Sequence, residues 1–256
     1  MKSCRWACCA AAGALALLGA GCGRAQEKTA TAPATVKATL ELSPTTPAAS
    51  GDVGSVTWAT YRPVQTIDPI QAFDYPDDTA VTLLCESLLR QRPDGSITDG
   101  LAKASRPDDR TLVLKLKQGV TFWDGKPVTP EDVVYSLERN RDEKLGGFYG
   151  QAFSRVKSIE ATGADEVTIS LERPDYWLDG ELSQMAGVVL EKRYVERLGR
   201  KFGTPAGGTM CTGAMKLSKW AGGDVLIAQR NADYTGASAR RWCGGWSCAA
   251  CPTRRT

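Results

Sequence analysis

The sequence predicts a mixed α/β protein, because segments with strand and helix patterns alternate along it. Leucines alternate with other residues at 111–116, which gives a strand one apolar face. Residues 133–137 carry an apolar helical stripe directly after a helix-start signal. The strand-like segments 156–161 and 167–171 follow as an adjacent pair. Strands that come in pairs between helices favour mixed sheets flanked by helices.

The first folded segments lie between residues 53 and 89. A strand is predicted at 55–59, and a proline-containing loop follows it. A helix is predicted from Asp77, because four apolar residues share one helical face. These residues are Val81, Leu84, Cys85 and Leu88. On this face Cys85 is interpreted as a small core hydrophobe.

The middle of the chain contains a turn and a strong helix-start signal. Val120–Trp123 is predicted as a strand that ends in the turn Asp124-Gly125. Thr129 is suited to cap a helix, with Pro130 at the first position and acidic residues after it. The later predicted elements are a helix at 191–198 and a hairpin of strands at 215–220 and 225–230.

Composition excludes several classes of site. The 256 residues include no histidine, so Ser/His/Asp or Cys/His catalysis and His-ligated metal sites are excluded. The formal charge of +3 arises from basic residues at the two ends, and residues 23–234 carry a net −3. The basic balance therefore gives no reason to expect nucleic acid as a partner. Seven of the nine cysteines also lie at the ends. The body holds only Cys85 and Cys211, so it is not a disulfide scaffold.

The N-terminus has the pattern of an export signal. Lys2 and Arg5 precede a short apolar run that ends in Leu18-Gly19-Ala20-Gly21-Cys22. This end resembles a bacterial lipobox, with Gly19 in place of the usual leucine. We therefore predict a signal peptide at 1–21 and a lipid on Cys22. The alternative is an ordinary secretory signal with an incidental cysteine.

The stretch after the signal is rich in Ala, Thr, Pro and Ser and contains almost no large apolar residue. Such a composition cannot bury enough surface to offset chain entropy. We predict a flexible tether at 22–52 that holds a folded domain off a membrane. The alternative is a disordered N-terminus without a role.

Residues 99–140 carry many fixed spacings at once. Residues 119–134 read G-V-T-F-W-D-G-K-P-V-T-P-E-D-V-V, and they follow the strand at 111–116. This stretch resembles solute-binding protein family 5 of bacterial ABC importers. The resemblance extends over 53–234 through three further segments, which are IDP at 67–69, CESLL at 85–89 and RNADY at 230–234. The family pattern GTGPFKL is altered here, at Cys211, Ala214 and Met215.

The resemblance implies a periplasmic-binding-protein-like type II fold, with one lobe largely present in 53–234 and the second missing. It implies a peptide/nickel-type lipoprotein on the outer face of the cell membrane, in the periplasm if a second membrane exists. Such a protein captures oligopeptides or similar small solutes and delivers them to permease subunits. It is not an enzyme and needs no cofactor. The absence of a P-loop and of later apolar runs excludes the ATPase and permease subunits themselves.

Two other functions remain possible from the sequence. Some related binding proteins present a ligand to a signalling receptor, and neighbouring permease genes would favour transport instead. A secreted hydrolase is the third possibility. The lack of histidine and of a Gly-x-Ser-x-Gly elbow counts against it.

The resemblance also implies where a ligand binds, since family ligands lie between the lobes. The candidate residues are Tyr61, Arg62, Phe148, Tyr149, Met185 and Gly187. Aromatic residues among glycines at 146–150 suit a wall that stacks against a ligand, although they also suit packing under a loop. Arg62 is expected either to pair with a ligand carboxylate or to be solvated.

The last 22 residues, 235–256, lose all periodicity and are dominated by Cys, Arg, Trp, Gly and Ala. This composition is expected when a gene is read in the wrong frame, so we predict a frameshift or truncation after Tyr234. The alternative is a metal site at Cys243, Cys248 and Cys251. Only the last two have ligand spacing and a fourth ligand is lacking, so no metal site is predicted.

Overall fold

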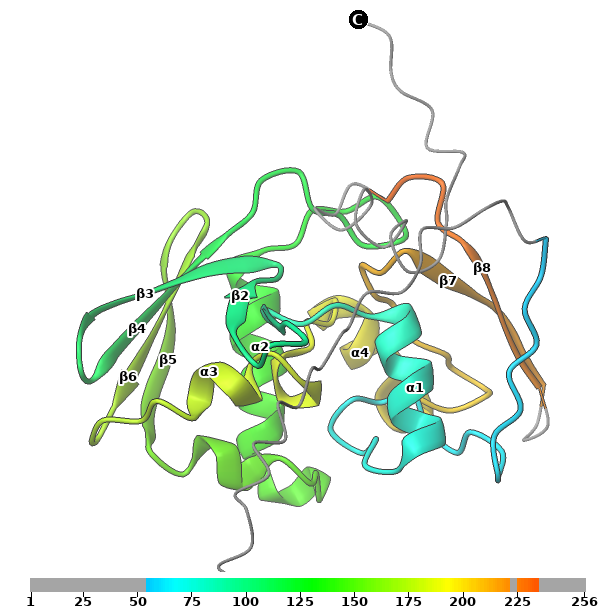
Figure 1. Cartoon of the computed structure of the whole chain (residues 1–256), viewed down its shortest axis with the longest axis horizontal. Coiled ribbons are helices and arrows are strands. Elements are labelled where there is room, and N and C mark those ends of the chain that lie inside the picture. The colour runs from blue at the N-terminus through cyan, green and yellow to red at the C-terminus, as the bar shows by residue number, and fades with distance from the viewer. Residues whose placement is uncertain (1–53, 222–224, 235–256) are drawn as a thin grey trace, which may run out of the picture. The chain divides into compact units, whose positions relative to one another are not determined.

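The computed structural model describes residues 54–221 and 225–234. The predicted signal peptide, the lipid on Cys22, the tether at 22–52 and the atypical tail at 235–256 lie outside the described residues. Within the described part, the elements form the mixed α/β arrangement that the sequence predicts, with antiparallel sheets and short helices (Figure 1).

The first hydrophobic core lies between a four-stranded antiparallel sheet and helix α2. The sheet has the order β3-β4-β6-β5. Its strands are β3 (Ala102–Asp108), β4 (Thr111–Leu116), β5 (Val156–Gly163) and β6 (Glu166–Leu171), and α2 spans Pro130–Arg141. Leu112, Leu114 and Leu116 of β4 are buried, as predicted. Val133 and Leu137 of α2 are fully buried against the same core.

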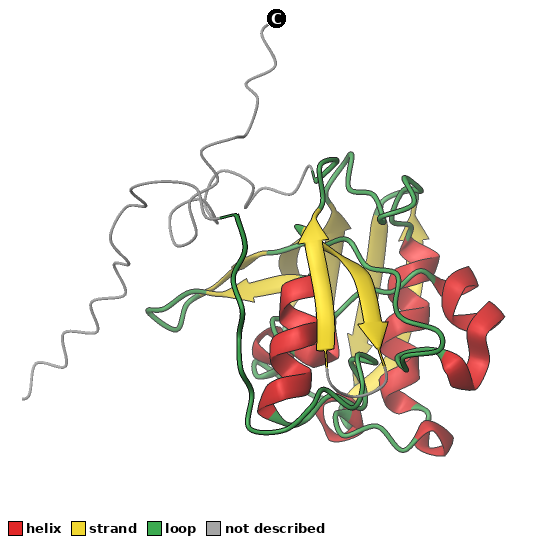
Figure 2. Cartoon of the chain, turned by 90° about the vertical axis from the view of Figure 1, so that its right-hand side faces the viewer, coloured by secondary structure: helices red, strands yellow, loops and turns green. Residues whose placement is uncertain are grey.

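The second core lies among helix α1, helix α4 and a β-hairpin, which faces the viewer in Figure 2. These elements are α1 (Tyr75–Leu84), α4 (Lys192–Leu198), β7 (Met215–Ala221) and β8 (Val225–Arg230). The remaining elements are β1 (Leu89–Gln91), β2 (Ile97–Asp99), α3 (Leu178–Glu181) and the 3₁₀ turns η1 (Glu143–Leu145), η2 (Gly150–Phe153), η3 (Met185–Gly187) and η4 (Gly199–Lys201). The predicted strand pair, hairpin and short helix are therefore confirmed.

The start of α2 shows why its position was predictable. Thr129 accepts a hydrogen bond from the backbone N–H of Asp132, and the Asp132 carboxylate accepts one from the N–H of Thr129. This reciprocal capping satisfies two backbone donors from local sequence alone. Asp132 also accepts a hydrogen bond from the N–H of Lys192 (2.9 Å), so the cap of α2 positions the start of α4.

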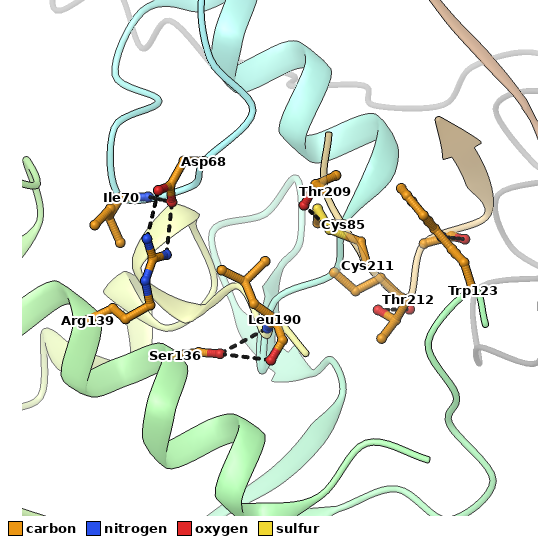
Figure 3. The surroundings of a disulfide bond; sticks show 12 residues. Asp68, Ile70, Cys85, Trp123, Ser136, Arg139, Leu190, Thr209, Cys211 and Thr212 are labelled. Atoms are coloured by element: carbon orange, nitrogen blue, oxygen red, sulfur yellow. Dashed lines mark hydrogen bonds and ion pairs between the residues drawn. A yellow bond between two sulfur atoms is a disulfide. The ribbon is translucent and has the colours of Figure 1, made fainter. Parts of the chain in front are cut away.

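Two polar contacts join α2 to segments of the second core (Figure 3). Arg139 donates to both carboxylate oxygens of Asp68, at 2.9 and 2.7 Å, and both side chains are buried. The hydroxyl of Ser136 accepts a hydrogen bond from the N–H of Leu190 (2.9 Å). Arg139 and Ser136 lie on one face of α2. This helix therefore packs against the first core and also binds segments of the second.

A disulfide joins Cys85 to Cys211 (Figure 3), which corrects the interpretation of Cys85 as a simple core hydrophobe. Cys85 is buried as expected, but its sulfur is bonded to a residue 126 positions away. The N–H of Gly213 donates to the carbonyl of Leu84 (3.1 Å), so the backbones also meet here. Sequence periodicity reports burial of a residue and says nothing of a partner so distant in the chain.

Helix α1 differs from its prediction at both ends. It begins at Tyr75, two residues before the expected start, because the side chain of Asp74 caps it. It ends at Leu84, so Cys85 and Leu88 lie beyond the helix. Leu88 instead donates its N–H to the carbonyl of Gly187 (2.8 Å). Long-range backbone partners thus replace the helical hydrogen bonds that the apolar stripe predicted.

Two predicted strands are absent from the described residues, and three strands of that part, β1, β2 and β3, were not predicted. Residues 55–59 have no strand partner there, and Val56 and Trp58 are exposed. Val120–Trp123 forms part of a tight loop with one isolated bridge, between Thr121 and Pro127. The missed strand β3 contains Pro107 and pairs only with β4, because it lies at the sheet edge, where proline is tolerated.

Candidate functional site

The loop after α2 brings Phe148 to the segment before α1. Gly147 approaches Ile70 so closely that a Cβ there would lie 3.1 Å from the Cβ of Ile70. The N–H of Phe148 donates to the carbonyl of Ile70 (2.9 Å), which fixes the loop on residues 70–73. The glycines around Phe148 therefore permit a close contact between two distant segments.

This contact creates an exposed aromatic pair. The ring of Phe148 stacks on that of Phe73, with centroids 4.9 Å apart and planes tilted by 31°. Phe148 is 55% exposed and Phe73 is 65% exposed. Large apolar side chains that pack mainly on each other, with most of their surface in water, mark a surface available to a ligand. Sequence reasoning missed Phe73, because the predicted helix began at Asp77 and the cap at Asp74 was not expected.

Tyr149 has a more internal position than Phe148. Its ring is partly buried against the first core, and its hydroxyl donates to the carbonyl of Ala72. Burial, followed by the negative charges of Asp78 and Glu181, raises the pKa of Tyr149 to about 12. Its phenol is therefore neutral at physiological pH and holds the loop of Phe148 to residues 70–73.

Arg62 pairs with carboxylates of the protein itself, and its role toward a ligand stays a prediction. Its guanidinium binds Asp77 through two nitrogens, at 2.9 and 3.3 Å, and Asp74 through Nε at 2.8 Å. These hydrogen bonds, first to Asp77 and then to Asp74, raise the pKa of Arg62. Asp77 is buried and also accepts the N–H of Gln65 (2.8 Å). Arg62 thus fastens the loop before α1 to the helix start.

Tyr61 remains an accessible ring at this edge. Its side chain is 71% exposed, and its hydroxyl donates to Asp74. The hydrogen bonds from Tyr61 and Arg62 lower the pKa of Asp74. Because Asp74 follows Phe73 directly, the two predicted pairs of site residues meet at residues 73–74. The structure therefore brings Tyr61 and Arg62 to the same short segment as Phe148 and Tyr149.

Met185 and Gly187 lie in η3 and contribute to packing. Met185 packs against the second core. Gly187 is buried, and a Cβ there would lie 1.9 Å from the carbonyl oxygen of Leu182. Backbone packing alone therefore accounts for the glycine, and neither residue contacts the stacked pair through a hydrogen bond. Their role toward a ligand stays a prediction.

Within the described residues, no cluster of three or more His, Cys, Asp or Glu side chains is placed to hold a metal ion. A search of the same residues for a helix both long and apolar enough to cross a bilayer finds none.

A family model described as bacterial extracellular solute-binding proteins, family 5 Middle, matches residues 96–241, more than half of the chain. The chain belongs to this family. The family segment that the sequence resembled most, 99–140, contains β4, the capped start of α2 and the loop between them. Cys85 of the CESLL segment and Cys211 of the altered GTGPFKL segment are bonded to each other.

Curated relatives of the family 5 chain carry peptide-binding names. The probable peptide-binding protein YejA of Agrobacterium fabrum is 28% identical over 174 residues, which cover 62% of this chain and 27% of YejA. The periplasmic murein peptide-binding protein MppA of Escherichia coli is 27% identical over 186 residues, covering 66% and 34%. The chain thus spans about a third of the length of these relatives.

Solved structures of the family share the fold. The unliganded open form of MppA superposes with a TM-score of 0.61 at 23% identity, covering 67% of this chain and 37% of MppA. The Haemophilus influenzae OppA complex with the peptide RPPGFSPFR gives 0.62 at 21% identity, covering 68% and 37%. The type II binding-protein fold expected from the sequence is confirmed for part of one lobe.

Proposed function

We propose that this chain binds peptides or similar small solutes outside the cytoplasm, for delivery to the permease of an ABC importer. The observation that carries the proposal is the exposed stack of Phe73 and Phe148 in a chain of a solute-binding family. Stacked rings offer a flat apolar surface to peptide planes and side chains. The peptide-binding names of the relatives support the same solute class.

The proposed ligand-facing wall consists of exposed aromatic rings and of the side chains that hold their loops in place. Phe73, Phe148 and Tyr61 supply exposed rings. Arg62 and Tyr149 hold the two loops that carry these rings, through their contacts with residues 72–77. Met185 and Gly187 are proposed as further ligand-binding residues of the same lobe.

Calorimetry with a pool of short peptides tests this wall. Phe73→Ala and Phe148→Ala should each weaken binding about tenfold, because each removes one half of the stack. Ile227→Ala is the matched control, since it removes an exposed apolar side chain from β8. Equal weakening by all three variants, or by none, would contradict the proposed wall.

We also propose export and anchoring through a lipid on Cys22, with residues 22–52 as a tether. The Cys85–Cys211 disulfide supports export, because disulfides persist mainly in oxidising compartments. Cys22→Ser should release the protein from membranes, as measured by fractionation. Intact-mass analysis that finds an unmodified N-terminus at another residue would contradict the anchor.

A further inference from the structure

A concavity of about 400 Å³ opens beside Phe148, between η2 and α3. Aromatic and charged side chains share its lining. They are Phe148, Tyr149, Arg155, Asp175, Trp177 and Glu181. The pocket thus continues from the stacked pair onto a surface that the sequence did not single out.

Trp177 is the most exposed of these aromatic residues. Its side chain is 81% exposed, although the next residue, Leu178, is almost fully buried. The backbone N–H of Trp177 donates to the carboxylate of Asp175 (3.0 Å), which fixes the segment that carries the indole. An indole this exposed contributes little to the core, and its faces are available at the pocket.

The charges of the pocket leave one carboxylate in excess. Arg155 lies 3.6 Å from Asp175 and donates to the carbonyl of Pro174 (3.5 Å), so its charge is compensated locally. Glu181 is partly buried, and within the described part of the chain its carboxylate has neither an ion-pair partner nor a hydrogen-bond donor. The negative charge of Glu181 contributes to the raised pKa of Tyr149.

We propose that this pocket binds a cationic nitrogen of the solute, either an α-ammonium group or a basic side chain. The faces of Phe148, Tyr149 and Trp177 attract a cation through their ring quadrupoles, and Glu181 supplies the counter-charge. An anion would meet the repulsion of Glu181, and Arg155 is already engaged. A neutral apolar group would leave the Glu181 carboxylate desolvated without compensation. The inference rests on the proposed function and names its substrate class.

Small probes test the pocket without requiring a complete peptide site. The full chain is titrated with N-acetyl-lysine amide, with glycine amide and with uncharged N-acetyl-norleucine amide. Binding is followed by the indole N–H signal of Trp177 in nitrogen-15 NMR spectra, assigned with Trp177→Phe. The lysine or the glycine probe should shift this signal, and which of them does identifies a side chain or an α-ammonium group as the source of the cation. The norleucine probe should not shift it.

Two charge variants should act in opposite directions. Glu181→Gln should weaken cation binding about tenfold, because it removes the excess charge. Arg155→Gln should strengthen it, so loss of folding in one variant leaves the other as a test. Glu160→Gln is the matched control, since Glu160 is exposed on β5 and does not line the pocket.

The outcomes separate this inference from the proposed function. No indole shift with either cation, an equal shift with norleucine, or unchanged affinity in both charge variants overturns the cation pocket. If the peptide pool binds while the cations do not, the pocket fails and the proposed function stands. If the cations bind while no peptide does, the pocket stands and the proposed function fails.

Discussion

At the scale of single residues, two arginines join distant segments in different environments. Arg139 and Asp68 are both at least nine-tenths buried, and Arg139 also lies over the ring of Phe202. Arg62 is partly buried and ties a loop to the start of α1, through the buried Asp77 and the more exposed Asp74. Removing one partner of a buried ion pair leaves the other charge uncompensated, whereas a pair that water can reach contributes less. The Arg139–Asp68 pair, with both side chains buried, should therefore matter more for stability.

Arg139→Met should lower the free energy of unfolding by about 3–5 kcal/mol, because it leaves the Asp68 carboxylate buried and uncompensated. Urea unfolding measures this change. The double variant Asp68→Asn/Arg139→Met should recover much of the loss, since it removes both charges. A single variant as stable as the parent chain would mean that Asp68 finds solvent or another donor.

Tyr149 should titrate near pH 12, well above an exposed tyrosine. Its folded-state pKa is raised above the unfolded value of about 10, so its contribution to stability is complete below pH 10. That contribution is lost as the pH rises from about 10 to 12. Difference absorbance between the parent chain and Tyr149→Phe should isolate this late phenolate, and its appearance at pH 10 would contradict the buried position.

Local signals in the sequence predicted some residues of the site and not others. The loop at 146–150 was predicted as a candidate site because its glycines and its two aromatic residues are neighbours in the sequence. Phe73 could not be paired with Phe148 in this way, since 75 positions separate them and only the contact of Gly147 with Ile70 brings them together. The pairing of Arg62 with Asp74 and Asp77 could not be predicted from local sequence either. The same holds for the pocket lined by Trp177.

At the scale of elements, the same division holds. The start of α2 was predicted because Thr129 and Asp132 satisfy each other within one turn. The end of α1 was not, because the carbonyl of Leu84 and the N–H of Leu88 bind residues more than 90 positions away. Strand β3 depended on pairing with β4 more than on its own weak alternation. Tertiary contacts decided where the local pattern was ambiguous.

The disulfide acts on elements, since it fixes the end of α1 to the segment before β7. Cys85→Ala/Cys211→Ala should lower the free energy of unfolding by about 2–5 kcal/mol, because the bond closes a long loop in the unfolded chain. Urea unfolding of both proteins, with and without reductant, measures it. Reductant should destabilise the parent chain after prolonged unfolding and leave the double variant unchanged. Equal stability of the two oxidised proteins would show that the bond adds no constraint.

At the scale of the whole molecule, the described residues offer a ligand one wall. Binding proteins gain affinity when a ligand is enclosed and its apolar surface leaves water, at about 25 cal/mol per Å². A ligand on Phe73 and Phe148 alone keeps its outer side in solvent. Apolar side chains are also exposed elsewhere in this lobe, among them Val56, Trp58, Val225 and Ile227. Such a surface is suited to further protein segments, and it is a liability without them.

We therefore predict that the 256-residue chain binds peptides weakly, with a dissociation constant in the millimolar range. If the frameshift expected after Tyr234 is present, a version with the downstream frame restored should bind at least about a hundredfold more tightly, a gain of about 2.7 kcal/mol. Calorimetry of both proteins with the same peptide pool measures the difference. Equal micromolar binding by the two would contradict the prediction, since one wall would then supply the whole affinity.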